Sequence, residues 1–172
     1  MVKYIFDLDL TLYSEHDYKD SEIETEYYSS FRKKNFLKQL LNQVKGKKYL
    51  LTNANLAHTS VVLEKLNLLD IFEDVISSDV VNSYKPYRLM YDVAIREFNI
   101  DKNEEVYYFE DLPENLKTGK KHFNWTTVLI SPTKVRKPKY IDYVFGTIED
   151  ALLFFVVKDK FNDKTEVLNK FN

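Results

Sequence analysis

Short apolar runs alternate with segments of helical period along most of this chain. The runs with strand character cover residues 2–6, 48–52, 75–77, 106–110, 126–130 and 143–145. Between them, apolar residues recur at helical spacing over 36–44, 61–69, 89–98 and 148–156, and a further short helix begins at Leu116. Strands and helices that alternate in this way predict an α/β fold, with helices on both faces of a parallel sheet.

The 172 residues are most simply one domain, which is large enough to bury a hydrophobic core. We predict that this domain spans residues 1–157 and that residues 158–172 form a final helix or a tail. About 40 residues separate the ends of the first two strands, and the helix at 36–44 takes up part of them. Residues 14–34 are therefore left for a short insert.

The composition excludes several classes of protein. A net charge of −2 gives no general electrostatic reason to bind nucleic acid or a membrane. The absence of cysteine excludes disulfides and thiolate chemistry. We expect no signal peptide, because the N-terminal apolar stretch is only a strand long, and no apolar run is long enough to cross a bilayer. We expect a cytoplasmic protein without a membrane partner, and both a monomer and an oligomer remain open.

Asp7 and Asp9 follow directly on the first predicted strand, one residue apart. Two such carboxylates repel each other and are costly to desolvate, so stability alone does not explain them. At this place Asp7 can attack phosphorus and form an aspartyl-phosphate. Asp9 can protonate the leaving oxygen and later take a proton from water. For an isolated pair of acids, the alternative is an Asx-type turn after a strand.

Thr52 ends the second predicted strand and Asn53 follows it. A hydroxyl and backbone N–H groups at such a turn can hold phosphate oxygens. The alternative is a strand-end threonine beside a helix N-cap at Asn53 or Asn55. Lys85, just before Pro86, can neutralise both the Asp7 carboxylate and an incoming phosphate. By itself it would be one surface lysine among many.

Glu110 and Asp111 follow the fourth apolar strand. Mg²⁺ prefers oxygen ligands and needs few carboxylates, because it keeps several of its waters. Asp7, the backbone carbonyl of Asp9 and Asp111 would be enough protein ligands. We expect Glu110 to act on the metal through a water.

The remaining candidates favour structural interpretations. His16, His58 and His122 have no metal-ligand spacing, and we interpret each as a surface or turn residue. Aromatic side chains gather in and near the predicted insert, where packing over the end of the sheet is preferred to stacking on a base. They are Tyr13, Tyr18, Tyr27, Tyr28 and Phe31.

The four segments that contain Asp7 and Asp9, Thr52, Lys85, and Glu110 with Asp111 occur in this order along the chain. Together they resemble the motifs of the haloacid dehalogenase (HAD) superfamily of phosphotransferases. The resemblance implies a Rossmann-like fold, a nucleophile at Asp7 and an acid/base at Asp9. It also implies phosphoryl binding by Thr52 and Lys85, and Mg²⁺ binding at Asp111. Haloacid dehalogenases usually lack an acid where Asp9 stands, which favours phosphate-ester chemistry.

A finer resemblance, carried by residues 6–13 and 109–120, points to the pyrimidine 5′-nucleotidase branch. That branch has Asn where Leu10 stands, and it carries a large helical cap between its first two motifs. Residues 14–34 are too few for such a bundle, so a capless or minimally capped enzyme is predicted. Without a cap the cleft is open, unless the insert or a partner subunit covers it.

These features predict a Mg²⁺-dependent phosphatase that hydrolyses phosphate monoesters through an aspartyl-phosphate. The candidate substrates are nucleoside 5′-monophosphates and, alternatively, phosphoprotein or polynucleotide ends. A phosphomutase or other phosphotransferase is a further alternative, although it needs a closed, dry site. A non-catalytic binding module is the last alternative, although a binding role does not require an acid at Asp9.

Overall fold

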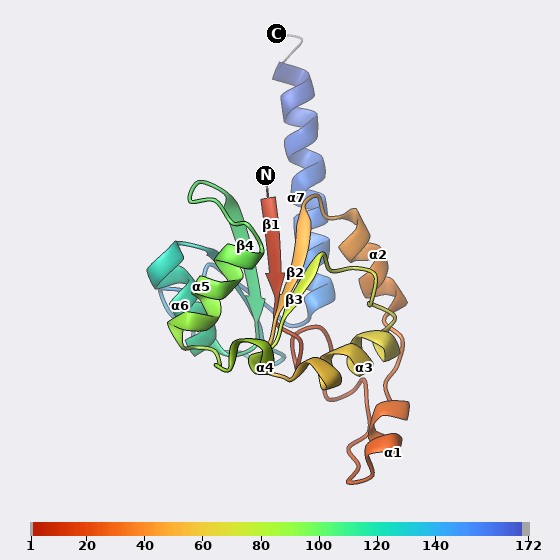
Figure 1. Cartoon of the computed structure of the whole chain (residues 1–172). Helices are drawn as coiled ribbons and strands as arrows, with labels where there is room; N and C mark the ends of the chain where they lie inside the picture. The colour runs from red at the N-terminus through yellow and green to blue at the C-terminus, as the bar shows by residue number, and fades with distance from the viewer. Residues whose placement is uncertain (1, 170–172) are drawn as a thin grey trace.

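A six-stranded parallel sheet forms the centre of the protein (Figure 1). The computed structural model describes residues 2–169, with side chains described as far as residue 162. The strands are β1 (Val2–Phe6), β2 (Lys47–Leu51), β3 (Asp74–Ile76), β4 (Glu105–Glu110), β5 (Thr126–Ile130) and β6 (Tyr143–Phe145). Their order is β3-β2-β1-β4-β5-β6, and every neighbouring pair is parallel. The predicted α/β fold is confirmed, and each predicted strand lies within one residue of its predicted bounds.

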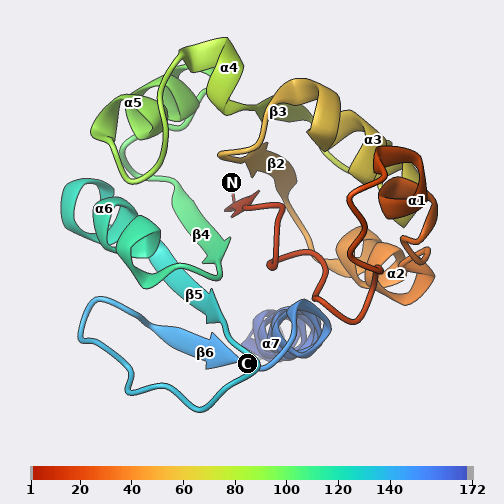
Figure 2. The same cartoon turned by 90° about the horizontal axis from the view of Figure 1, so that it is seen from below.

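Helices cover both faces of this sheet (Figure 2). They are α1 (Glu24–Ser29), α2 (Asn35–Gln43), α3 (Leu56–Leu66), α4 (Ser78–Val81), α5 (Arg88–Glu97), α6 (Pro113–Phe123) and α7 (Ile148–Asn169). One core cluster joins α2, α3 and α7 to the sheet, and the other joins α5 and α6 to its opposite face. None of the described helices is long and apolar enough to span a membrane.

The two clusters follow from the alternation of side chains along β1. Tyr4 and Phe6 point into the cluster under α2, α3 and α7, whereas Ile5 points into the cluster under α5 and α6. Phe6 stacks on Phe109 of the neighbouring β4 with ring centroids 4.6 Å apart. Each fully buried apolar side chain of this size stabilises the fold by about 1.5–3 kcal/mol. The central strands therefore hold the residues that follow them in fixed places.

Helices α3 and α6 differ from their predicted bounds for local reasons. The pattern predicts a helix over 61–69, but α3 begins after Asn55, whose side chain accepts the His58 N–H and caps it. It ends at Leu66 because Asn67 adopts the left-handed conformation. Helix α6 starts at Pro113 and not at Leu116, because a proline suits the first helical turn although it adds nothing to an apolar period.

Helix α1 occupies the predicted insert at 14–34 and is only six residues long, with none of its own residues fully buried. The short α4 is likewise without a sequence prediction. An apolar period cannot be detected over so few residues. Aromatic side chains hold the insert together, as the packing interpretation predicts: Tyr13 and Tyr18 lie with ring centroids 5.1 Å from Phe31.

Helix α7 is continuous across the boundary predicted between residues 157 and 158. It begins at Ile148 on the core and runs past the end of the sheet to Asn169 (Figure 1). Up to residue 162, its buried side chains are Ile148, Ala151, Leu152, Phe155 and Val156. The last residues of the predicted tail, 170–172, lie outside the described part of the chain.

The direction of chain connection changes at β1, which lies between β2 and β4. In open α/β sheets, ligands bind beyond the C-terminal ends of the strands at such a switch point. Figure 2 looks onto these ends and shows α1 beside α3, away from the ends of β4 and β5. The fold therefore brings together the residues that follow β1, β2 and β4.

A substitution at Gly46, between α2 and β2, tests how closely the backbone packs at the centre of the sheet. Its φ is +132°, and a Cβ there would lie 2.4 Å from the backbone oxygen of Val2. Gly46→Ala should therefore lower the free energy of unfolding by about 2 kcal/mol or more, measured by urea denaturation. Gly146→Ala is the matched control, because its Cβ would meet nothing closer than 3.9 Å. Equal losses for both variants would contradict this account.

Candidate functional site

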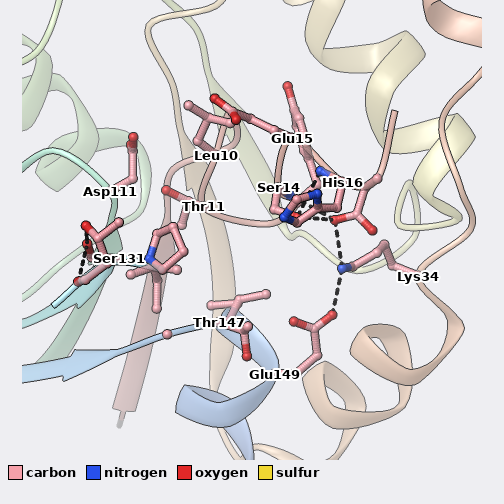
Figure 3. A pocket seen from close by; sticks show the side chains of 17 residues that line it. Leu10, Thr11, Ser14, Glu15, His16, Lys34, Asp111, Ser131, Thr147 and Glu149 are labelled. Carbon is pink, nitrogen blue, oxygen red and sulfur yellow. Dashed lines mark hydrogen bonds and ion pairs between the residues drawn. The ribbon is translucent and has the colours of Figure 1, made fainter. Parts of the chain in front are cut away.

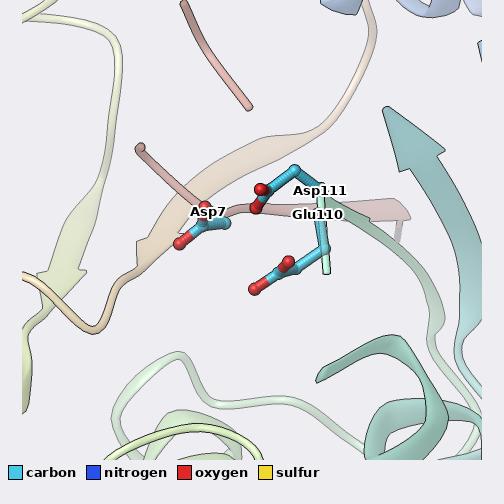
Figure 4. Close-up of side chains that lie close together, drawn as sticks. All are labelled: Asp7, Glu110 and Asp111. Carbon is cyan, nitrogen blue, oxygen red and sulfur yellow. The ribbon is translucent and has the colours of Figure 1, made fainter. Parts of the chain in front are cut away.

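Three acids from the ends of two neighbouring strands converge on one point (Figure 4). Asp7 follows β1, Glu110 ends β4 and Asp111 comes next. The strands pair in parallel, and the Asp7 N–H donates to the Phe109 carbonyl at 2.9 Å. One carboxylate oxygen from each acid lies within 4.8 Å of the others. This spacing suits three ligands or near-ligands of a single cation.

Lys85 binds two of these acids from a fully enclosed position. Its ammonium donates to Asp7 Oδ1 at 2.6 Å, to Glu110 Oε1 at 2.9 Å and to the Leu51 carbonyl at 2.8 Å. Its side chain is 1% exposed. An ammonium has three protons, and each has an acceptor here. Lys85 is thus fixed in place by the ends of β1, β2 and β4 together.

The turn after β2 positions the backbone of Lys85. The Asn53 side chain donates to the Lys85 carbonyl at 3.1 Å and accepts the Lys85 N–H at 2.7 Å. Thr52 is fully buried, and its hydroxyl accepts the Ala54 N–H at 3.0 Å. Thr52, Asn53 and Lys85, the three predicted phosphate-binding residues, therefore lie together, and the Asn53 amide is already engaged in holding Lys85.

Glu110 has donors on both of its oxygens. Besides Lys85, the Asn115 side-chain amide donates to Oε1, and the Leu112 N–H donates to Oε2 at 2.6 Å. Its residue exposure is 1%. Glu110 thus ties the first turn of α6 to Lys85. Asp111, which is half-buried, is the acid of β4 that lies nearer to solvent.

Burial and mutual repulsion perturb the acids of the site. Burial raises the pKa of Asp7 although Lys85 opposes the shift, and burial together with Glu110 and Asp7 raises the pKa of Asp111. Burial acts against the charge of Lys85, but Asp7 and Glu110 outweigh it, and the pKa of Lys85 is raised. When all three carboxylates are ionised, one ammonium leaves an excess of two negative charges. Carboxylate oxygens with that excess fit a divalent cation such as Mg²⁺.

Asp9 is hydrogen-bonded to α3 and to the turn after β1. His58 Nε2 lies 3.0 Å from Asp9 Oδ1, and the Tyr13 hydroxyl donates to the same oxygen. Burial acts upward on the Asp9 pKa, but the hydrogen bonds from His58 and Tyr13 outweigh it, and the pKa is lowered. The Asp9 side chain is 42% exposed, so it remains open to a substrate.

The prediction for His58 as a surface or turn residue missed this contact. Its side chain is 22% exposed and lies between Asp9 and Tyr28, whose hydroxyl is 2.9 Å from His58 Nδ1. One feature of the sequence could have indicated the contact: His58 lies in the first turn of the helix after β2, three residues beyond the cap at Asn55. That turn lies at the same edge of the sheet as Asp9.

A cavity of about 450 Å³ opens beside Asp111 (Figure 3). Its walls come from the turn after β1, the loop after β5 and the first turn of α7. At one wall Lys34 forms ion pairs with Asp17 at 3.1 Å and with Glu149 at 2.8 Å. Its pKa is raised, because these two acids outweigh the effect of burial. The insert is therefore bound to α7 next to the acid cluster.

Comparison with known proteins identifies the family. The family model for haloacid dehalogenase-like hydrolases matches residues 32–122, more than half of the chain. The chain belongs to the haloacid dehalogenase-like hydrolase family. The matched region of this HAD-like hydrolase contains Thr52, Lys85, Glu110 and Asp111, and Asp7 precedes it. Among curated proteins, no sequence matches the chain.

Solved structures share the fold of this HAD-like hydrolase. The HAD phosphatase from Thermococcus onnurineus superposes with a TM-score of 0.72 at 17% identity, over 88% of this chain and 96% of that one. The L-2-haloacid dehalogenase from Xanthobacter autotrophicus gives 0.69 at 14% identity, over 87% and 96%. The HAD-hydrolase YfnB from Bacillus subtilis, bound to magnesium, gives 0.62 at 16%, over 70% and 55%.

Because the acids of this site are buried close together, we expect them to lower the stability of the metal-free protein. Asp111→Asn should raise the melting temperature of the protein in EDTA by about 2–4 °C, which corresponds to about 1 kcal/mol at this size. The gain should be larger at pH 8 than at pH 5. An unfolded aspartate loses its proton near pH 4, while the folded carboxyl keeps it to higher pH, so wild-type stability falls as the pH rises through this interval.

Glu114→Gln is the control, because Glu114 is an exposed acid in the first turn of α6. Thermal unfolding followed by circular dichroism, with and without Mg²⁺, measures both variants. Mg²⁺ should stabilise the wild type and the control more than Asp111→Asn. A destabilised Asp111→Asn protein in EDTA would contradict the account of repulsion.

Proposed function

We propose that this HAD-like hydrolase is a Mg²⁺-dependent phosphatase that cleaves phosphate monoesters through an aspartyl-phosphate on Asp7. The observation that carries the proposal is the cluster of buried Asp7, Glu110 and Lys85 with half-buried Asp111, in which three carboxyl groups face one ammonium. A divalent cation balances this set, and a phosphoryl group then finds positive charge from both the cation and Lys85.

The residues divide the chemistry between them. Asp7, Asp111 and the backbone carbonyl of Asp9 would hold Mg²⁺, which when bound neutralises charge on the carboxylates and the phosphoryl oxygens. An oxygen of Asp7 bonds to phosphorus as the bond to the alcohol oxygen breaks, and Asp9 gives that oxygen its proton. Water then attacks phosphorus, Asp9 takes a proton from it, and inorganic phosphate leaves the restored Asp7 carboxylate.

Relatives with the same fold differ in their chemistry. One similar structure is described as a phosphatase and another as magnesium-bound, while a third is a haloacid dehalogenase. Dehalogenation is the weaker candidate for this chain, because displacing a halide needs neither a proton donor at Asp9 nor the charge excess around Asp7. A phosphomutase is also weaker, because Asp9 is well exposed and a transfer to sugar needs a dry site.

Two substrate classes remain in competition. Nucleoside 5′-monophosphates are supported by the resemblance of residues 6–13 and 109–120 to the nucleotidase branch. Phosphopeptides or phosphorylated oligonucleotides are supported by the small size of the insert, whose only helix is the six-residue α1. A chain with so little cover can accept a large substrate.

Asp7→Asn tests the nucleophile. An amide oxygen is a poor nucleophile, so turnover of an aryl phosphate with Mg²⁺ should fall by about 10³-fold or more, measured as phosphate release. The variant should fold normally. Asp92→Asn, at an exposed ion pair on α5, is the isosteric control and should keep wild-type turnover. A folded Asp7→Asn protein with near wild-type activity would remove Asp7 from this role.

A substrate comparison tests the openness of the site. With an open site, kcat/KM should differ only modestly among an aryl phosphate and several nucleotides, because little beyond the phosphate is bound. A phosphopeptide or phosphorylated oligonucleotide should be cleaved much faster, since remote contacts orient its phosphate. Preference for one small nucleotide by about 100-fold or more would instead indicate a built pocket and restore the nucleotidase assignment.

A further inference from the structure

Asp9 is held by a chain of side chains that reaches into the insert. His58 on α3 contacts Asp9 through Nε2, and Tyr28 on α1 contacts His58 through Nδ1. A carboxylate only accepts hydrogen bonds, so Nε2 must carry the imidazole proton in the contact with Asp9. In the tautomer with its proton on Nε2, Nδ1 is an acceptor to which the Tyr28 hydroxyl can donate. A Tyr28 hydroxyl that donates to Nδ1 therefore favours the tautomer that donates to Asp9.

The described hydrogen bonds to the Asp9 side chain end on one oxygen. His58 and Tyr13 both donate to Oδ1, and none of the described hydrogen bonds ends on Oδ2. Two donors, one on α3 and one on the turn after β1, restrain the carboxylate. They also leave Oδ2 as the oxygen that can exchange a proton with water or substrate.

We propose that His58 is a positioning residue for Asp9: with Tyr28 behind it, it holds the Asp9 carboxylate so that Oδ2 receives the proton of the attacking water. The inference rests on the proposed phosphatase function. In the step concerned, the water oxygen bonds to phosphorus, the bond between phosphorus and the Asp7 oxygen breaks, and the water proton moves to Asp9 Oδ2. Phosphate leaves, and Asp7 is again a carboxylate.

The insert thereby acts on the chemistry without covering the site. Tyr28 is fixed by the aromatic cluster of the insert, since its ring centroid lies 5.1 Å from that of Tyr27. Tyr27 in turn packs at 5.2 Å from Phe31. The same cluster contains Tyr13, the second donor to Asp9. A small rigid insert can position Asp9 even though it is too short to enclose a substrate.

The test uses the full chain with Mg²⁺ and p-nitrophenyl phosphate, whose leaving group needs no proton from an acid. In His58→Ala, kcat should fall about 10- to 100-fold, the usual cost of losing a supporting hydrogen bond. kcat/KM should stay nearly unchanged, because it reports only the steps up to release of the phenol. KM should fall with kcat, and acid-quenched phosphoenzyme should accumulate and decay more slowly.

His58→Gln provides the rescue, because its amide N–H can reach the place of Nε2 and donate to Asp9. It should recover most of kcat, which a loss of packing alone would not explain. Tyr28→Phe keeps the ring and removes the hydroxyl, so it should slow phosphoenzyme decay to a smaller extent. His122→Ala, an exposed histidine on α6, is the control and should leave every constant unchanged.

Equal falls of kcat and kcat/KM in His58→Ala, or an unchanged phosphoenzyme lifetime, would overturn the role of His58. Failure of glutamine to rescue would do the same. If His58→Ala does not fold, Tyr28→Phe decides alone, and unchanged decay in it overturns the proposal. A wild-type protein that forms no phosphoenzyme overturns the phosphatase function and this inference together, and it is recognised before any variant is compared.

Discussion

The buried ammonium of Lys85 is the interaction on which the site depends. It lies between Asp7 and Glu110 with a third bond to the Leu51 carbonyl, so one side chain links the C-terminal ends of β1, β2 and β4. Removing one partner from a buried ion pair typically costs about 3–5 kcal/mol, because the other charge is left uncompensated. Lys85 therefore allows two carboxylates to be buried side by side, while Asn53 holds the backbone of Lys85 and Asn115 donates to Glu110.

The charges of the site are nevertheless unbalanced, which indicates that the site is not built for stability alone. Lys85 offsets one of three acids, and burial together with the neighbouring acids raises the pKa values of Asp7 and Asp111. Natural proteins accept such local conflict where a site has a task other than stability. The rest of the fold compensates through two continuous hydrophobic clusters, one on each face of the sheet.

Much of this could be predicted from the sequence, because the information is local. Each strand is an apolar run of its own, and the acids, Thr52 and Lys85 follow strands whose ends must meet at one edge of a parallel sheet. The links between Asp9, His58 and Tyr28 could not be predicted. They join positions up to 49 residues apart, and a single histidine on a helix carries no period or spacing that marks a partner. The C-terminal end of α7 could not be predicted for a similar reason, since the sequence of its last turns is too polar to show an apolar period.

The insert is anchored on both of its neighbours, α3 and α7, and its exposed turn lies between Asp17 and Tyr28. Tyr28 joins it to His58, and Lys34, with Asp17 and Glu149, joins it to the start of α7. Between Tyr18 and α1, residues 19–23 are mostly exposed. Exposed turns between fixed points are where chains tolerate insertions. Additional residues could enter this turn and grow into a larger cover over the cavity, while the acids at the strand ends stay where they are.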